Sequence, residues 1–168
     1  VAEERFQIPT LVQQKAIPLV LEKKNVIVSA QTGTGKTAAF ALPIVQLLFD
    51  EQEVEKKDKK IRSLVVTPTR ELAIQILENF KSFSKYSNLE ATAVFGGVSL
   101  EPQKEILGKG VDILIATPGR LIDLQMQGNI DLSAVEIFVL DEADLMLDMG
   151  FIVDIKKIEA LCPKKKQT

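Results

Sequence analysis

The sequence predicts an α/β domain built on a doubly wound parallel sheet with helices on both faces. Short β-branched runs alternate with longer helical stretches along the 168 residues, and this alternation is typical of parallel sheets. The runs are apolar almost throughout, which indicates that both faces of the sheet are covered. The length suits one domain, residues 1–168, with a substantial hydrophobic core.

Five strands and six helices are expected in chain order. The strands are Val26–Ser29, Ser63–Thr67, Ala91–Phe95, Ile113–Ala116 and Ile137–Leu140. The helices are Leu11–Glu22, Lys36–Phe49, Arg70–Tyr86, Leu100–Leu107, Pro118–Gln127 and Ile152–Leu161. Thr10 and Gln13 have the spacing of a capping box at the start of the first helix. Because ligands of such folds bind beyond the carboxyl ends of the strands, residues that follow each strand are the candidates for a site.

The composition limits which kinds of catalytic and metal sites are possible. The chain has no histidine and one cysteine, which excludes histidine-ligated zinc, a Ser-His-Asp triad and an internal disulfide. Any metal should therefore be a hard cation held by oxygen ligands, such as Mg²⁺. The net charge of −2 argues against a protein that coats nucleic acid by charge alone. No apolar run is long enough to span a bilayer, and the start does not read as a signal peptide, so no membrane association is expected.

A glycine-rich loop joins the first predicted strand to the second predicted helix. It consists of Ala30, Gln31, Thr32, Gly33, Thr34, Gly35, Lys36 and Thr37. The glycines let backbone N–H groups converge on phosphate oxygens at the positive end of the helix. We expect Lys36 to neutralise the β- and γ-phosphates of a nucleotide and the Thr37 hydroxyl to ligate Mg²⁺. The simpler alternative is a strand-to-helix turn that binds no phosphate.

Two acids follow the last predicted strand. Asp141 and Glu142 come directly after Ile137–Leu140, which places them at the same sheet edge as the phosphate loop. We expect Asp141 to hold Mg²⁺, largely through water, and Glu142 to orient and deprotonate an attacking water. With Lys36 they form the predicted catalytic set. The alternative is a solvated acidic helix start.

The order of these motifs resembles the DEAD-box RNA helicases, whose name is spelled by residues 141–144. The resemblance covers nearly the whole chain and corresponds to the first of the family's two RecA-like domains. Within the family, Val94–Ser99 and Leu147–Phe151 look closest to the bacterial RhlE-type branch. The resemblance implies ATP as the nucleotide, Mg²⁺ as its cation and RNA as the partner.

The resemblance also assigns a role to the start of the chain, which is similar to the family's adenine-reading Q motif. Phe6 would stack on the base, and Gln13 would read its edge, because an amide carries both a donor and an acceptor. The alternative is that Gln13 only completes the capping box of the first helix. The two roles are compatible.

Three further strand ends match the family's RNA-contacting motifs. Each places backbone N–H groups and small polar side chains where a helix begins, an arrangement that holds phosphates without reading sequence. By resemblance, the RNA-binding residues are Pro68, Thr69, Arg70, Gly97, Gln103, Thr117, Gly119 and Arg120. Taken singly, each motif also reads as an ordinary capped helix start.

By the same resemblance, the sheet should continue in a strand that carries a Ser-Ala-Thr motif beyond Thr168. That strand would lie between Val26–Ser29 and Ile137–Leu140, so these two segments should not pair directly. The fold class expected is thus a RecA-like sheet truncated before the Ser-Ala-Thr strand. A second RecA-like domain would supply arginines to the γ-phosphate, and without it the isolated chain should be nearly inactive.

The expected function is that of an ATP-dependent RNA helicase core domain, monomeric and cytoplasmic, which couples ATP hydrolysis to local duplex unwinding in the complete protein. Two alternatives remain. One is a DNA-acting helicase of the same superfamily, which an ATPase assay with RNA against DNA would detect. The other is an ATP-gated RNA clamp that does not hydrolyse ATP, which would keep its function when Glu142 is replaced by Gln.

Overall fold

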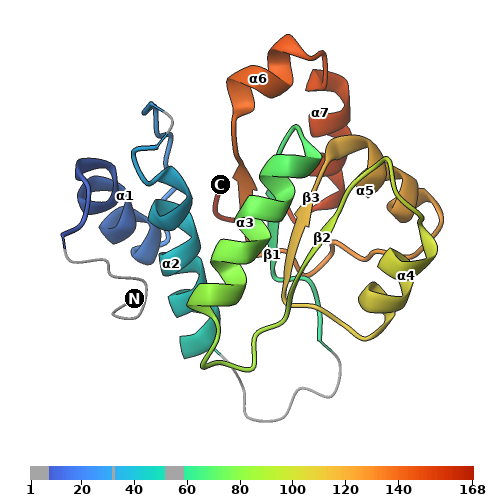
Figure 1. Ribbon diagram of the computed structural model, residues 1–168, viewed down its shortest axis with the longest axis horizontal. Helices are drawn as coiled ribbons and strands as arrows, with labels where there is room; N and C mark the ends of the chain where they lie inside the picture. Colours follow the sequence, from blue (N-terminus) through green and yellow to red (C-terminus); the bar gives the residue numbers. More distant parts are fainter. Residues whose placement is uncertain (1–7, 32, 52–58) are drawn as a thin grey trace.

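The computed structural model describes residues 8–31, 33–51 and 59–168, and Figure 1 shows a central sheet with helices on both of its faces. Within these residues the sheet has four strands, all parallel, in the order β2-β3-β1-β4. The strands are β1 (Ser63–Val66), β2 (Ala91–Val94), β3 (Ile113–Ala116) and β4 (Ile137–Leu140). The predicted doubly wound α/β fold is confirmed.

The helices follow the predicted order. They are α1 (Leu11–Leu21), α2 (Lys36–Asp50), α3 (Arg70–Phe83), α4 (Glu101–Gly108), α5 (Pro118–Met126), α6 (Ala143–Asp148) and α7 (Ile152–Leu161). The short helix α6 was not predicted. Only Met146 of α6 is buried, and six residues are too few to show the apolar period of a helix in the sequence.

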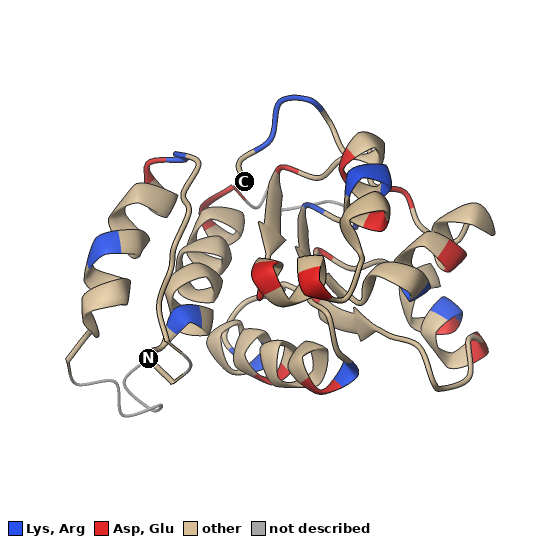
Figure 2. Ribbon diagram, turned by 90° about the horizontal axis from the view of Figure 1, so that it is seen from above, with Lys and Arg blue, Asp and Glu red and all other residues tan. Residues whose placement is uncertain are grey.

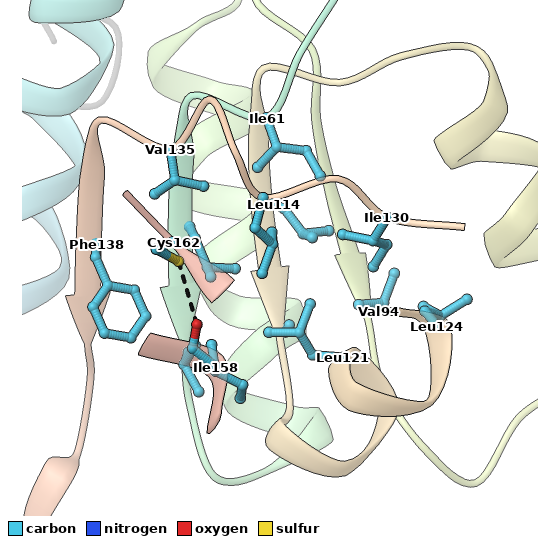
Figure 3. Close-up of a cluster of buried hydrophobic side chains, with 14 of the residues drawn as sticks. Ile61, Val94, Leu114, Leu121, Leu124, Ile130, Val135, Phe138, Ile158 and Cys162 are labelled. Atoms are coloured by element: carbon cyan, nitrogen blue, oxygen red, sulfur yellow. Dashed lines mark hydrogen bonds between the residues drawn. The ribbon is translucent and has the colours of Figure 1, made fainter. Parts of the chain in front are cut away.

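The strands bury side chains on both faces of the sheet. Leu64 and Leu114 join a core cluster with α5 and α7, which Figure 3 shows in close-up. Val65 and Ile115, one residue further along, point the other way into a cluster with α2 and α3. All four side chains have no exposed surface. Because successive strand residues point to opposite faces, uniformly apolar strands require helices on both sides.

The prediction of a strand at Val26–Ser29 is wrong. This segment has no regular secondary structure, and the Ile27 side chain is fully exposed. The Val26 N–H donates to the carbonyl of Thr168 at 3.0 Å. A strand exists only where a partner continues the ladder of hydrogen bonds, and a single bond does not provide that ladder.

The expected separation of this segment from β4 is observed. Gln167 forms a parallel bridge with Ile137, its carbonyl accepts from the Phe138 N–H at 2.8 Å, and its own N–H donates to the Glu136 carbonyl at 2.8 Å. The last residues of the chain thus lie beside the start of β4, with Val26 on their other side. Among the described residues, no helix combines the length and apolar character needed to cross a membrane.

Candidate functional site

The predicted phosphate loop leads into the N-terminus of α2. Gly33 and Gly35 have φ angles of 81° and 85°, a left-handed conformation that glycine adopts without a steric penalty. The Thr34 hydroxyl donates to the Gln31 carbonyl at 2.7 Å. Thr32 lies outside the described residues. Gly35 is the N-cap of α2 and no side chain caps that end, so the N–H groups of the first turn are available to an anion.

An ion pair joins the loop to the acidic motif. The Lys36 Nζ donates to Glu142 Oε1 at 2.9 Å, and the two side chains are 23% and 22% exposed. The two residues are 106 positions apart in the chain. The structure therefore brings together the basic and acidic members of the predicted catalytic set.

Glu142 holds an unusual backbone conformation. Its φ and ψ of 52° and 48° are left-handed, and it stands between β4 and α6. For a residue with a Cβ this conformation is uncommon, and such sparsely populated conformations cost on the order of 1–3 kcal/mol. They cluster at functional sites, where surrounding contacts maintain them. In this conformation the Glu142 side chain contacts Lys36.

The surroundings of Asp141 affect the ionisation of its carboxyl group. Burial raises the pKa of its carboxyl group above the usual value, the negative charge of Glu142 raises it further, and Lys36 opposes both. A hard divalent cation would offset the cost of this buried charge. Asp141 and the half-buried Thr37 offer the oxygen ligands that Mg²⁺ prefers.

The donor set fits Mg²⁺ held mainly by water and phosphate oxygens. The described part of the chain contains no group of three or more His, Cys, Asp or Glu side chains that could hold a metal ion alone. Mg²⁺ commonly keeps several waters and binds through one or two carboxylates plus phosphates of a substrate. Mg²⁺ binding by Thr37 and Asp141 stays a prediction.

Gln13 links α1 to the phosphate loop. Its side chain is buried and its Oε1 accepts from the Thr10 N–H at 3.0 Å, which completes the predicted capping box. Its Nε2 donates to the Gly35 carbonyl at 3.3 Å. The sequence did not indicate this second contact, because nothing in the motif shows which backbone carbonyl the amide meets. Phe6 lies outside the described residues, so adenine reading by Phe6 and Gln13 stays a prediction.

An open cavity of about 670 Å³ adjoins this region. It lies between α1 and residues 26–31, and its lining is mainly apolar. Thr10 at the start of α1 and Gln31 and Thr34 of the phosphate loop are among its lining residues. Its volume is in the range of small-molecule sites.

The predicted RNA-binding residues follow three neighbouring strands. Thr69 and Arg70 come after β1, Gly97 after β2, and Thr117 after β3, and the sheet order β2-β3-β1 puts these ends side by side. Thr69 caps α3, its hydroxyl accepting from the Leu72 N–H at 3.3 Å. Thr117 is the N-cap of α5 and makes no side-chain cap bond.

These residues differ in exposure. Arg70, Gly97 and Gly119 are exposed, whereas Pro68 and Gln103 are buried. The Arg120 side chain is only 11% exposed. Figure 2 shows lysines and arginines interspersed with acids along the helices rather than gathered in one stripe. Any nucleic acid would therefore be held by local geometry at the strand ends.

A glycine-rich loop that leads into α2, joined by an ion pair to an acidic motif after β4 of the parallel sheet, is typical of P-loop nucleotide-binding domains. The chain belongs to the DEAD/DEAH box helicase family, because the model of that family matches residues 10–168.

Similar proteins carry related names. The chain is 46% identical to "Probable ATP-dependent RNA helicase ddx27" of Dictyostelium discoideum over 97% of its length and 21% of that protein. It is 44% identical to "ATP-dependent RNA helicase RhlB" of Shewanella piezotolerans over 98% of its length and 38% of that protein. The RhlE-type subgroup stays a prediction, because relatives at similar identity include RhlB and a eukaryotic protein.

A solved structure has the same fold. It is described as a hypothetical ATP-dependent RNA helicase from Sulfolobus tokodaii, with a TM-score of 0.88 and 46% identity over 99% of this chain and 46% of that one. The chain thus spans less than half the length of each of these proteins.

Proposed function

We propose that this chain is the N-terminal, RecA-like core domain of an ATP-dependent RNA helicase. In the complete protein it would bind ATP with Mg²⁺ and the backbone of single-stranded RNA, and couple hydrolysis to local unwinding of short duplexes. The observation that carries the proposal is the meeting of Lys36 and Glu142 at 2.9 Å. That contact lies beyond the carboxyl end of β4, at the same end of the sheet as the candidate RNA-binding helix starts.

The nucleotide part rests on the phosphate loop. Lys36 would leave Glu142 for the β- and γ-phosphates, while the free N–H groups at the start of α2 bind phosphate oxygens. The cavity between α1 and residues 26–31 would accept the base. Bound Mg²⁺, held by Thr37 and Asp141, would supply neutralisation of the charge that develops on the phosphates.

Hydrolysis would depend on Glu142. Once Lys36 has turned to the phosphates, the Glu142 carboxylate is free to accept a proton from the attacking water. A second RecA-like domain would complete the site with arginines, and such an arginine contributes about 10³–10⁵ in rate. Closure of two domains around ATP and RNA couples the ligands, because each favours the closed state.

The RNA part rests on three adjacent strand ends. The starts of α3 and α5 and the exposed Gly97 would each meet one segment of the sugar-phosphate backbone, which needs no base reading. A monomeric, cytoplasmic protein is part of the proposal.

The first test is ATP hydrolysis by the protein that carries this domain together with its second RecA-like domain. ATPase activity should rise with single-stranded RNA and not with DNA of the same sequence; equal stimulation by DNA would favour a DNA-acting helicase instead.

Glu142→Gln in the same protein should lower RNA-stimulated hydrolysis at least about 100-fold, the usual contribution of a general base, while ATP binding is retained. Glu105→Gln is the matched control, since Glu105 is an exposed acid on α4 paired with Lys109. If unwinding persists in Glu142→Gln without hydrolysis, the protein acts as an ATP-gated clamp.

A further inference from the structure

The loop that follows β2 is held in place by a side chain from α4. The Phe95 N–H donates to Gln103 Oε1 at 3.2 Å, and Gln103 Nε2 donates to the Phe95 carbonyl at 3.1 Å and to the Ser99 carbonyl at 3.5 Å. The Gln103 side chain is buried. Its amide therefore pairs with the Phe95 backbone as a neighbouring strand would, and it ties both ends of residues 95–99 to α4.

A second side chain holds the same loop from α5. Arg120 Nη2 donates to the Val98 carbonyl at 2.9 Å, and Arg120 Nε lies 4.0 Å from the Asp123 carboxylate. Nη1 is buried and has no hydrogen-bond partner among the described residues. The guanidinium group thus packs mainly against the protein, with Nη1 buried and Nη2 held by the Val98 carbonyl.

The outer side of the loop is open. Gly96 and Gly97 are exposed, and a Cβ built on either meets no atom within 4 Å. Gly97 has a φ of 78°. The Arg70 guanidinium lies over the Phe95 ring at 5.2 Å, a favourable cation–π distance. Gly96 and Gly97 are therefore exposed to solvent in a loop that is contacted by residues of α3, α4 and α5.

We infer that Gln103 and Arg120 are positioning residues that hold the Gly96–Gly97 backbone ready for an RNA strand, and that neither binds RNA itself. The inference rests on the proposed RNA-binding function. It differs from the expectation drawn from the resemblance, in which Gln103 and Arg120 are both among the RNA-binding residues. Pre-formed loops bind with less loss of conformational freedom, so loosening this loop lowers affinity without removing any contact to RNA.

Salt dependence separates positioning from direct contact. Each cation that neutralises a phosphate of single-stranded RNA contributes about 0.7 to the slope of log K against log salt. Arg120→Met should therefore leave the slope unchanged if Arg120 only positions the loop, and lower it by about 0.7 if Arg120 binds phosphate. Gln103→Met does not change the charge, so it serves as the reference for the effect of loosening the loop alone.

The experiment titrates a single-stranded oligoribonucleotide into the isotope-labelled chain at several salt concentrations and follows the NMR shifts, which detect millimolar binding. Gln103→Met and Arg120→Met should each weaken RNA binding about threefold to tenfold, the factor of one lost hydrogen bond. The double variant should lose less than the product, because both side chains act on one loop. Lys109→Met removes an exposed charge from the other end of α4 and should change neither affinity nor slope.

Amide exchange of residues 95–99 supplies a readout that needs no RNA. The Phe95 amide should exchange faster in Gln103→Met, and residues 97–99 should become more mobile in Arg120→Met, while ADP affinity stays unchanged. A lower salt slope in Arg120→Met, or looser loops with unaltered RNA affinity, would overturn the inference. Failure of the unsubstituted chain to bind RNA would instead refute the proposed function, and the exchange data would still show whether the two residues order the loop.

Discussion

Gly35 is the position where one substitution tests the link between α1 and the phosphate loop. A Cβ at Gly35 would lie 2.5 Å from Gln13 Nε2 and 3.4 Å from Thr10 Oγ1. Alanine there must displace the Gln13 amide, in addition to adopting a left-handed backbone with φ near 85°. Gly33 is a matched control, because its φ is 81° and a Cβ there meets nothing within 4 Å.

The expected losses follow from these contacts. A left-handed conformation costs an alanine about 1–2 kcal/mol, and the stiffer unfolded chain offsets about 0.4–1 kcal/mol of that. Gly33→Ala should therefore lower the free energy of unfolding by about 1 kcal/mol. Gly35→Ala also loses the bond from Gln13 to the Gly35 carbonyl, worth about 1 kcal/mol, for a total of about 2 kcal/mol.

Urea unfolding of the nucleotide-free chain measures both losses. The same two substitutions made together with Gln13→Ala isolate the contact, because the amide that Gly35→Ala displaces is then already gone. The difference between the two glycine variants should disappear in that background. Equal losses for both variants with Gln13 present, or a difference that survives Gln13→Ala, would refute the reasoning.

Three further predictions concern the acids and the core. Asp141→Asn should stabilise the metal-free chain at pH 7. Because the pKa of the Asp141 carboxyl group is raised in the folded state above its unfolded value near 3.8, the group stabilises the fold only while it is protonated. That contribution is present below the unfolded pKa and is lost as pH rises through the folded pKa. Unfolding curves at a series of pH values should show this advantage shrinking toward acid, and an advantage that does not vary with pH would contradict it. Glu142→Gln should bind ADP more tightly than the unsubstituted chain, because Lys36 loses its ionic partner; calorimetry that finds weaker binding would exclude competition between Glu142 and phosphate. Leu114→Ala should cost about 2–5 kcal/mol of unfolding free energy, since Leu114 is fully buried in the interior strand β3, and a loss below about 1 kcal/mol in urea would show that the cluster in Figure 3 repacks.

The strands show what the sequence can predict and where it fails. Ile113–Ala116 and Val26–Ser29 are both largely apolar and contain β-branched residues, yet only the first forms a strand. Strand formation depends on neighbours that continue the ladder, and β3 has β1 and β2 on either side. No local pattern shows whether such neighbours are present.

The candidate site was likewise predicted only in part. The loop and the acids were predicted because their residue types and spacing carry the chemistry, and the fold brings Lys36 to Glu142. The directions of buried polar side chains were not predicted. Whether Gln103 and Arg120 face RNA or the protein depends on contacts with Phe95 and Val98, which helix periodicity and motif spacing do not determine.

If Lys36 binds phosphate as proposed, its contact with Glu142 would compete with the nucleotide for the same ammonium group. Because both groups belong to one chain, this competition would not depend on protein concentration. The apparent dissociation constant for a nucleotide rises in inverse proportion to the fraction of molecules in which Lys36 is free, so a pair that is closed nine-tenths of the time weakens binding about tenfold. The group proposed to activate water would thereby also set a threshold for nucleotide concentration.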